Sequence, residues 1–303
     1  MIVRPRLHWL RMLFVWRGSV LPRILARLGF FFGLACAVVA LYETLGPLPF
    51  RLEPAPLALL GVTLAIFLGF RNSTSYERFW EGRKLWGSLL IVSRSFMRQA
   101  LTLPTPAPER EERLALCGLL RALAVTLNHQ LRGTPLNAGV LPAAVWERVR
   151  DAHYKPARIV QLLAEWLTEQ RRRGRLGDML AASLDDNLNR LSEIIGGCER
   201  IASTPIPYVY GVMLHRTVYL YSLLLPFALA GSLGWTTPLI TVFISYTFIA
   251  LDAVTEELED PFGTEPNDLP LDAMTRTIER AVLELAGEPV PPALIPGDDC
   301  VLT

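Results

Sequence analysis

The sequence predicts an all-α membrane protein with four transmembrane helices and a helical cytoplasmic portion. The 303-residue chain is 51% hydrophobic and only 19% charged, below the roughly 25% charge of soluble domains. Charged residues are absent from three long apolar runs, 28–42, 54–70 and 217–251. No segment shows the sustained period-2 alternation that is typical of half-buried strands.

Each apolar run predicts one or two membrane spans. A span needs about 20 apolar residues, so the 35-residue run 217–251 is too long for one helix. It is broken at 231–238 by glycines and a proline, which predict a turn between two spans. A large soluble core could also contain such runs, but two runs joined by a turn favour a membrane. The predicted spans are 24–45, 54–75, 213–232 and 236–255.

These spans divide the chain into four predicted parts. Residues 1–75 hold an N-terminal interfacial helix and the first two spans, and 76–212 form the helical cytoplasmic portion. Residues 213–255 hold the last two spans. Residues 256–303 hold an acidic motif, a helix and an irregular tail after Gly287.

The basic residues predict the orientation. Residues 1–27 contain six arginines and no acid, whereas the first predicted loop has Arg51 as its only cation. An excess of Lys and Arg belongs on the cytoplasmic side, so both termini and 71–216 are expected on the cytoplasmic side of the inner (plasma) membrane. Apolar residues between the N-terminal arginines predict an interfacial amphipathic helix rather than a signal peptide. These are Leu7, Trp9, Leu10, Leu13, Phe14 and Trp16.

The predicted cytoplasmic portion has helical apolar spacing with short Gly and Pro breaks. Residues 76–100 follow the second span without a strong breaker, so one long helix is expected to leave the membrane there. The other predicted helices are 108–131, 142–150, 156–173 and 177–201.

Composition and motifs argue against several function classes. A net charge of +1 disfavours a nucleic-acid-binding protein. The four cysteines stand far apart without a CxxC pair, and the four histidines are isolated. No nucleotide-binding, serine-hydrolase or zinc-protease motif occurs. We therefore predict no enzymatic activity, no cofactor and no metal site, and we interpret the acids at 185–186 and 256–260 as solvated or salt-bridged.

The second span carries two neighbouring stripes of four-residue period. Small residues form one of them, and such strips allow close helix packing in lipid. Larger apolar residues form the other, which could face a central axis as a narrow constriction that gates by dewetting. Alternatively, both stripes are ordinary packing faces in a monomeric bundle. The small stripe is Gly61, Ala65 and Gly69, and the larger one is Val62, Ile66 and Phe70.

Polar residues follow the apolar stretch directly. An arginine at the bilayer centre costs roughly 2.5–3.5 kcal/mol on insertion scales, so Arg71 is expected at the cytoplasmic boundary. Together with Asn72 and Ser73 it would form the inner mouth of a pore.

Four stretches of the sequence resemble the prokaryotic branch of the bestrophin family. They are 16–19 (WRGS), 64–87 (LAIFLGFRNSTSYERFWEGRKLWG), 197–208 (GCERIASTPIPY) and 256–263 (EELEDPFG). The resemblance implies a homopentameric ion channel whose hydrophobic neck falls on Val62, Ile66 and Phe70. It also implies a second constriction near Met179 and Leu180.

The expected partners are membrane lipid, monovalent ions and other copies of the chain. The calcium-clasping acidic run of animal bestrophins is reduced here to Glu265 and Asp268, so we predict no calcium site at these residues. Chloride is the family default, but acids such as Glu43 and Glu53 leave cation conduction equally open. The alternatives are a non-conducting membrane scaffold and a membrane-anchored enzyme.

Overall fold

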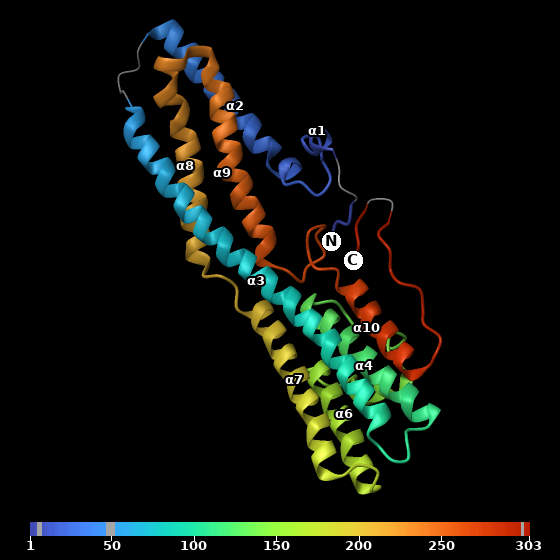
Figure 1. Cartoon of the computed structure of the whole chain (residues 1–303). Helices are drawn as coiled ribbons and strands as arrows, with labels where there is room; N and C mark the ends of the chain where they lie inside the picture. The colour runs from blue at the N-terminus through green and yellow to red at the C-terminus, as the bar shows by residue number, and fades with distance from the viewer. Residues whose placement is uncertain (5–7, 47–51, 298–299) are drawn as a thin grey trace. The chain divides into compact units, whose positions relative to one another are not determined.

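The structure, a computed structural model, describes residues 1–4, 8–46, 52–297 and 300–303. These residues form helices and no strand, apart from one isolated bridge between Ile2 and Val301, so the all-α prediction is confirmed (Figure 1). The chain divides into two compact units. We call 6–79 with 205–259 the apolar unit, and 1–5, 80–204 and 260–303 together the polar unit.

The helices of the apolar unit coincide with the four predicted spans. The connection between α8 and α9 is a short 3-10 turn, Gly234–Thr236, at the predicted break. Arg51, the cation of the first predicted loop, lies outside the described residues. The spans correspond to α2 (Leu21–Leu45), the first half of α3 (Pro54–Thr102), α8 (Tyr208–Leu233) and α9 (Thr237–Glu259).

Four stretches are long and apolar enough to cross a membrane: α2, α3, the α8–α9 stretch, and α4 (Arg110–Leu131). The sequence predicts that α4 lies outside the membrane. Its apolar residues from Leu116 to Leu127 are largely buried within the polar unit, where it packs against α6 and α10. Length and composition alone do not separate a buried core helix from a span. Packing accounts for the apolar character of α4, so we keep it as a core helix.

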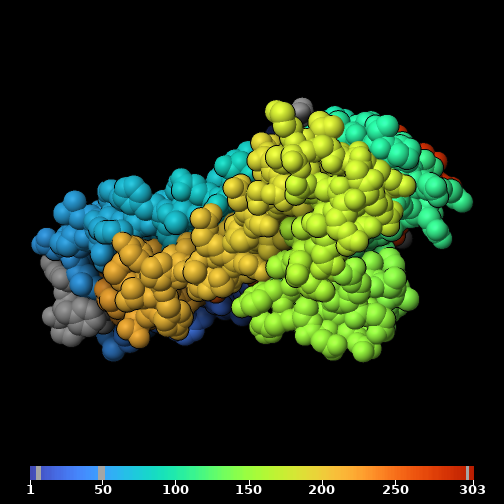
Figure 2. Space-filling model, turned by 90° about the horizontal axis from the view of Figure 1, so that it is seen from below, coloured from blue at the N-terminus to red at the C-terminus, as the bar shows by residue number. Residues whose placement is uncertain are grey.

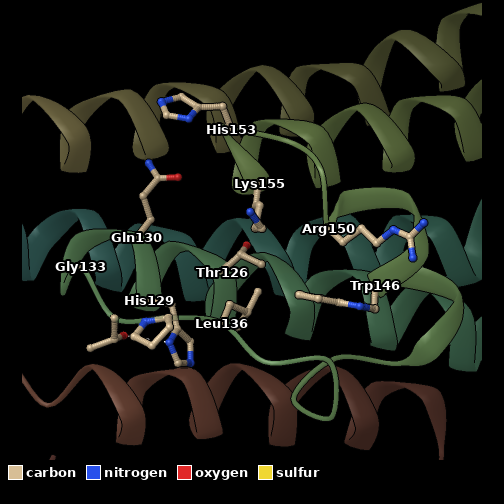
Figure 3. A pocket seen from close by; sticks show the side chains of 11 residues that line it. Thr126, His129, Gln130, Gly133, Leu136, Trp146, Arg150, His153 and Lys155 are labelled. Carbon is tan, nitrogen blue, oxygen red and sulfur yellow. Dashed lines mark hydrogen bonds between the residues drawn. The ribbon is translucent and has the colours of Figure 1, made fainter.

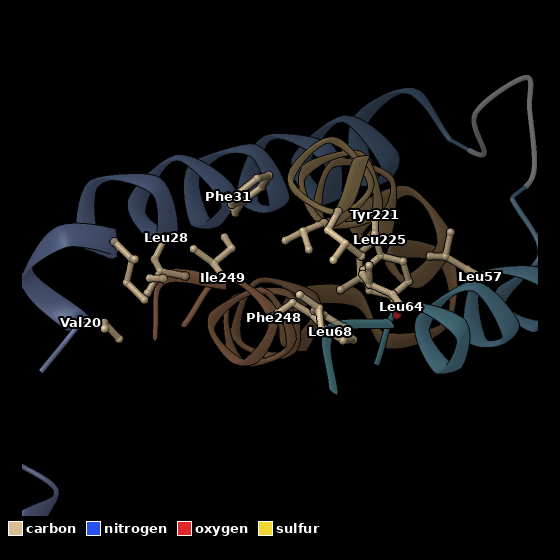
Figure 4. Packing of buried hydrophobic residues seen from close by; sticks show 14 of the residues in the cluster. Val20, Leu28, Phe31, Leu57, Leu64, Leu68, Tyr221, Leu225, Phe248 and Ile249 are labelled. Carbon is tan, nitrogen blue, oxygen red and sulfur yellow. The ribbon is translucent and has the colours of Figure 1, made fainter. Parts of the chain in front are cut away.

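The apolar unit is held together by side chains from all four of its long helices (Figure 4). On α3 the buried positions recur at three- and four-residue intervals, as expected for one face of a helix. They are Leu57, Gly61, Leu64 and Leu68. They meet Leu28 and Phe31 of α2, Tyr221 and Leu225 of α8, and Phe248 and Ile249 of α9. This packing fixes which face of α3 points away from its own chain.

The polar unit consists of the second half of α3 and five further helices. Of these, α6 and α7 lie side by side on the surface shown in Figure 2. Two stretches that carry the bestrophin resemblance meet in this unit, because Phe262 packs against Gly82. A Cβ at Gly82 would lie only 3.1 Å from the Phe262 ring, so glycine is needed for this contact. The helices are α4, α5 (Ala143–Val149), α6 (Lys155–Arg172), α7 (Asp178–Ser203) and α10 (Leu271–Ala286).

Little regular helix is found among the described residues at either end of the chain. The predicted N-terminal amphipathic helix is reduced to one turn, α1 (Trp9–Met12), and Leu7 lies outside the described residues. The flanking Phe14 and Trp16 are nevertheless exposed, as expected for a membrane-interface segment. At the other end α10 stops at Gly287, whose φ of 73° favours glycine, and the described residues beyond it are irregular as predicted.

Two buried cysteines should resist alkylation in the folded protein. Burial raises the pKa of Cys117 to about 11 and that of Cys198 to about 12, so little thiolate exists at neutral pH. Maleimide labelling followed by mass spectrometry should modify Cys300, which is partly exposed, well before either of them. Denatured protein is the control and should label at all these sites. Rapid native labelling of Cys198 would contradict this packing.

Candidate functional site

The stripe of Val62, Ile66 and Phe70 is exposed on the face of α3 opposite its buried positions. Their exposed fractions are 60%, 54% and 66%. Residues four apart lie about 6 Å apart along a helix, so the stripe presents three apolar levels on one side. Large apolar residues in this position need lipid or another protein surface around them. The face is therefore free to contact something outside its own chain.

The small-residue stripe divides between two environments. Gly61 is buried, and a Cβ there would lie 2.8 Å from the Tyr221 hydroxyl oxygen of α8. Gly61 therefore serves packing within its own chain. Ala65 and Gly69 are exposed, and a Cβ at Gly69 would meet nothing within 4 Å. We keep the proposed subunit-packing role for Ala65 and Gly69 alone.

Arg71, expected at the inner mouth, is held in ion pairs within its own chain. Its Nη1 donates to Asp252 Oδ1 at 2.6 Å, and its Nη2 and Nε both donate to Glu259 Oε1, at 2.8 and 3.0 Å. The Arg71 and Asp252 side chains are only 8% and 11% exposed. Two carboxylates thus neutralise the guanidinium, and they join α3 to α9 directly after the apolar stripe.

The ion pairs continue into an open pocket of about 650 Å³. His215 of α8 places Nδ1 3.0 Å from Asp252 Oδ2, so Asp252 bridges Arg71 and His215. Glu259 is further fixed through its backbone carbonyl, which accepts from Arg78 Nε at 2.7 Å. The cluster therefore couples the end of the apolar stripe to both α8 and α9. Since Asp252, Glu259 and His215 all lie more than 100 residues from Arg71 along the chain, sequence spacing did not reveal the cluster.

Breaking this cluster should destabilise the protein. Arg71→Met leaves the nearly buried Asp252 carboxylate without its strongest partner, and breaking a buried pair typically costs about 3–5 kcal/mol. We expect the thermal unfolding midpoint to fall by about 5–10 °C. The matched control is Arg190→Met, because Arg190 pairs with Asp186 at the surface and their side chains are 60% and 59% exposed. Equal shifts for both variants would show that the Arg71 cluster is not structural.

The other predicted inner-mouth residues differ in exposure. Asn72 is half-buried, whereas Ser73 is exposed and continues the spacing of the Ile66 and Phe70 stripe. Sequence reasoning missed Glu77, which is exposed four residues further on and forms no ion pair among the described residues. Glu77 is thus the first unneutralised charge on this face after the apolar stripe. Helical spacing in the sequence could have indicated Glu77, because Ser73 follows Ile66 by seven residues and Glu77 follows Ser73 by four.

Met179 and Leu180, the residues expected near a second constriction, lie in the first turn of α7. They are 89% and 42% exposed, whereas Ala181 and Leu184 of the same helix are buried in the polar unit. An exposed apolar pair at a helix start is compatible with a contact between copies of the chain.

Asp268 has a structural role in the loop before α10. Its carboxylate accepts a hydrogen bond from the backbone N–H of Glu265 at 2.7 Å, and the residue is only 4% exposed. Gly263 leaves room for this carboxylate, because a Cβ there would approach Asp268 Oδ2 to 2.5 Å. Over the described ranges, no group of three or more His, Cys, Asp or Glu residues is arranged to hold a metal ion.

Known proteins resemble this chain over nearly its whole length. The family model for bacterial and fungal bestrophin proteins matches residues 1–284. The chain belongs to the bestrophin family. It is 48% identical over 296 residues to the voltage-dependent anion channel-forming protein YneE of Escherichia coli K12, covering 97% of both chains. A voltage-dependent anion channel-forming protein of Ralstonia nicotianae is 47% identical over 292 residues, covering 95% of both.

Solved structures extend the bestrophin likeness to three dimensions. A bacterial bestrophin homologue from Klebsiella pneumoniae superposes with a TM-score of 0.82 at 43% identity, covering 88% of this chain and 99% of that one. A second structure, described as a membrane protein, gives 0.82 at 42% identity over the same shares. The resemblance stated from the sequence is therefore confirmed. The relatives of this chain are named as channel-forming proteins, and the chain has helices that are long and apolar enough to cross a membrane.

Proposed function

We propose that this bestrophin is a homopentameric channel for monovalent ions in the inner (plasma) membrane, with both termini cytoplasmic. The exposed stripe of Val62, Ile66 and Phe70 carries the proposal. It lies on a helix whose opposite face is already occupied within its own subunit. Five copies of α3, packed through Ala65 and Gly69, would turn this stripe toward a common axis. The channel-forming relatives and the family match support this arrangement.

In this proposal the apolar stripe forms the neck that controls permeation. An apolar constriction has no groups to replace the hydration shell of an ion, so it conducts only when it is wet. Val62 and Phe70 would bracket a ring of Ile66 side chains. Met179 and Leu180 are proposed to form a second apolar constriction from the start of α7.

Charges beside the neck must select the sign of the ion, because an apolar ring does not. Arg71 is neutralised by Asp252 and Glu259, whereas Glu77 is exposed and makes no ion pair with any residue that the structure describes. A ring of Glu77 carboxylates favours cations, while the names of the relatives support anions. Reversal potentials of purified protein in planar bilayers under a NaCl gradient decide between the two.

Glu77→Gln should shift that reversal potential toward the chloride equilibrium potential. Removing a ring of negative charge beneath the neck lowers the local cation concentration and raises that of anions. The shift should shrink at high salt, because screening shortens the range of the charge. Glu111→Gln, which removes an exposed carboxylate in the first turn of α4, is the matched control. A reversal potential that stays unchanged in Glu77→Gln removes this residue from the ion pathway.

Two rival functions give different results in the same bilayers. A non-conducting membrane scaffold or a membrane-anchored enzyme passes no current even when the oligomer is intact. An oligomeric protein that conducts, and loses conductance when dissociated, supports the channel.

A further inference from the structure

The polar unit contains an open pocket of about 360 Å³ that the proposed channel does not use (Figure 3). It is formed by the end of α4, the segment that follows, α5 and the start of α6. Figure 3 shows His129 and Gln130 on one side, Trp146 and Arg150 on the other, and Lys155 between them. Its volume lies in the range of roughly 300–1,000 Å³ that is typical of small-molecule sites.

The charged side chains that line this pocket are all basic. Arg150 and Lys155 are cationic, and His129 and His153 add two groups that can become cationic. Of the described residues that line it, none is acidic. The Arg150 guanidinium contacts Glu147 at 2.9 Å and Asp151 at 3.4 Å, but these carboxylates are 60% and 89% exposed, so water weakens both pairs and Arg150, unlike Arg71, stays available to an anion. The pocket is therefore electrostatically suited to an anion.

Lys155 retains donors for such an anion. Its ammonium group donates one hydrogen bond, to the Ala152 carbonyl at 2.9 Å, and makes no ion pair within the part of the chain that the structure describes. An ammonium group has three donors, so two remain. Lys155 also begins α6, an 18-residue helix with no side-chain cap and no acid in its first turn. The positive end of that helix dipole adds to the side-chain charges.

An apolar and aromatic wall completes the pocket. Trp146 is half-buried and Leu136 lies in the same lining, so an uncharged part of a ligand would have a surface to contact. Inorganic phosphate alone would fill only a small part of about 360 Å³. The combination suits a ligand with a charged phosphate end and a flat or apolar end.

We propose that this pocket binds a small organic phosphate, such as a nucleoside diphosphate. Its phosphate groups contact Lys155 and Arg150, and its uncharged part contacts Trp146 and Leu136. The proposal is independent of whether the protein conducts ions.

The probe is the fluorescent nucleotide MANT-ADP, titrated into full-length protein in detergent and followed by fluorescence anisotropy. Wild-type protein should bind the probe saturably. The double variant Arg150→Gln, Lys155→Gln should bind it about tenfold or more weakly, since two charge-assisted hydrogen bonds are lost. Lys155→Arg, which keeps the charge, should retain binding. The matched control is Arg172→Gln, an exposed arginine at the other end of α6, about 25 Å away along the helix.

Competition identifies the recognised part of the ligand. Unlabelled ADP should displace the probe, whereas the same concentration of adenosine or of inorganic phosphate should not. Equal displacement by adenosine overturns the role of the cationic groups, and equal displacement by phosphate overturns the role of Trp146 and Leu136. Absence of saturable binding, or equal binding by the double variant with an unchanged unfolding midpoint, overturns the site itself.

Discussion

Replacing Ile66 with alanine should raise the single-channel conductance or the open probability severalfold. The substitution shortens an apolar side chain that is 54% exposed within its own chain, so it leaves the internal core of the subunit intact. In the pentamer it would remove bulk from the narrowest apolar ring. A wider ring wets more easily, and wetting is the step that an apolar constriction controls.

The control for Ile66→Ala is Phe67→Ala. Phe67 is also exposed, at 42%, but lies about 100° further round the helix. Its truncation should leave conductance near the wild-type value. Planar-bilayer recording of both purified variants provides the comparison. If Ile66→Ala and Phe67→Ala give wild-type currents alike, Ile66 is not part of the gate.

The two glycines of the small stripe should respond differently to leucine. Gly61→Leu should sharply reduce the yield of folded protein, because even a Cβ at this position would lie 2.8 Å from the Tyr221 hydroxyl. Overpacking of this kind typically costs about 1–3 kcal/mol, and leucine adds three further carbons here. Gly69→Leu should leave the subunit folded, since a Cβ there meets nothing within 4 Å. It should instead disrupt the close approach between subunits.

Size-exclusion chromatography with light scattering separates these effects. Gly69→Leu should elute as smaller, folded species, whereas Gly61→Leu should be lost to aggregation. The milder Gly61→Ala should be partly rescued by Tyr221→Phe, which removes the nearest contacting atom. An intact pentamer in Gly69→Leu would refute the assignment of this face to subunit packing.

Sequence patterns located the long helices of the protein, but they predicted a longer N-terminal helix than the single turn of α1. Charge-free runs marked the four long helices of the apolar unit, and the absence of a breaker after Tyr76 correctly predicted the uninterrupted α3. The sequence also grouped Val62, Ile66 and Phe70 on one face of the helix. In the structure all three are exposed, because the apolar residues on the opposite face pack inside the chain.

The spacing of residues in the sequence did not predict which residues contact each other in the fold. Gly61 and Gly69 look equivalent in a four-residue repeat, and only the position of Tyr221 on α8 distinguishes them. Likewise the sequence predicts Arg71 at the inner mouth of a pore but does not show that Asp252 and Glu259 neutralise its charge. In each case the partner is distant along the chain, so tertiary packing decides the environment.

The most direct test of the channel is an experimental density map of the purified oligomer in lipid nanodiscs. The account predicts five subunits around one axis, with Val62, Ile66 and Phe70 of every α3 facing a central opening that is narrowest at these residues. A map in which these three side chains face lipid, or in which no axial opening exists, would contradict it.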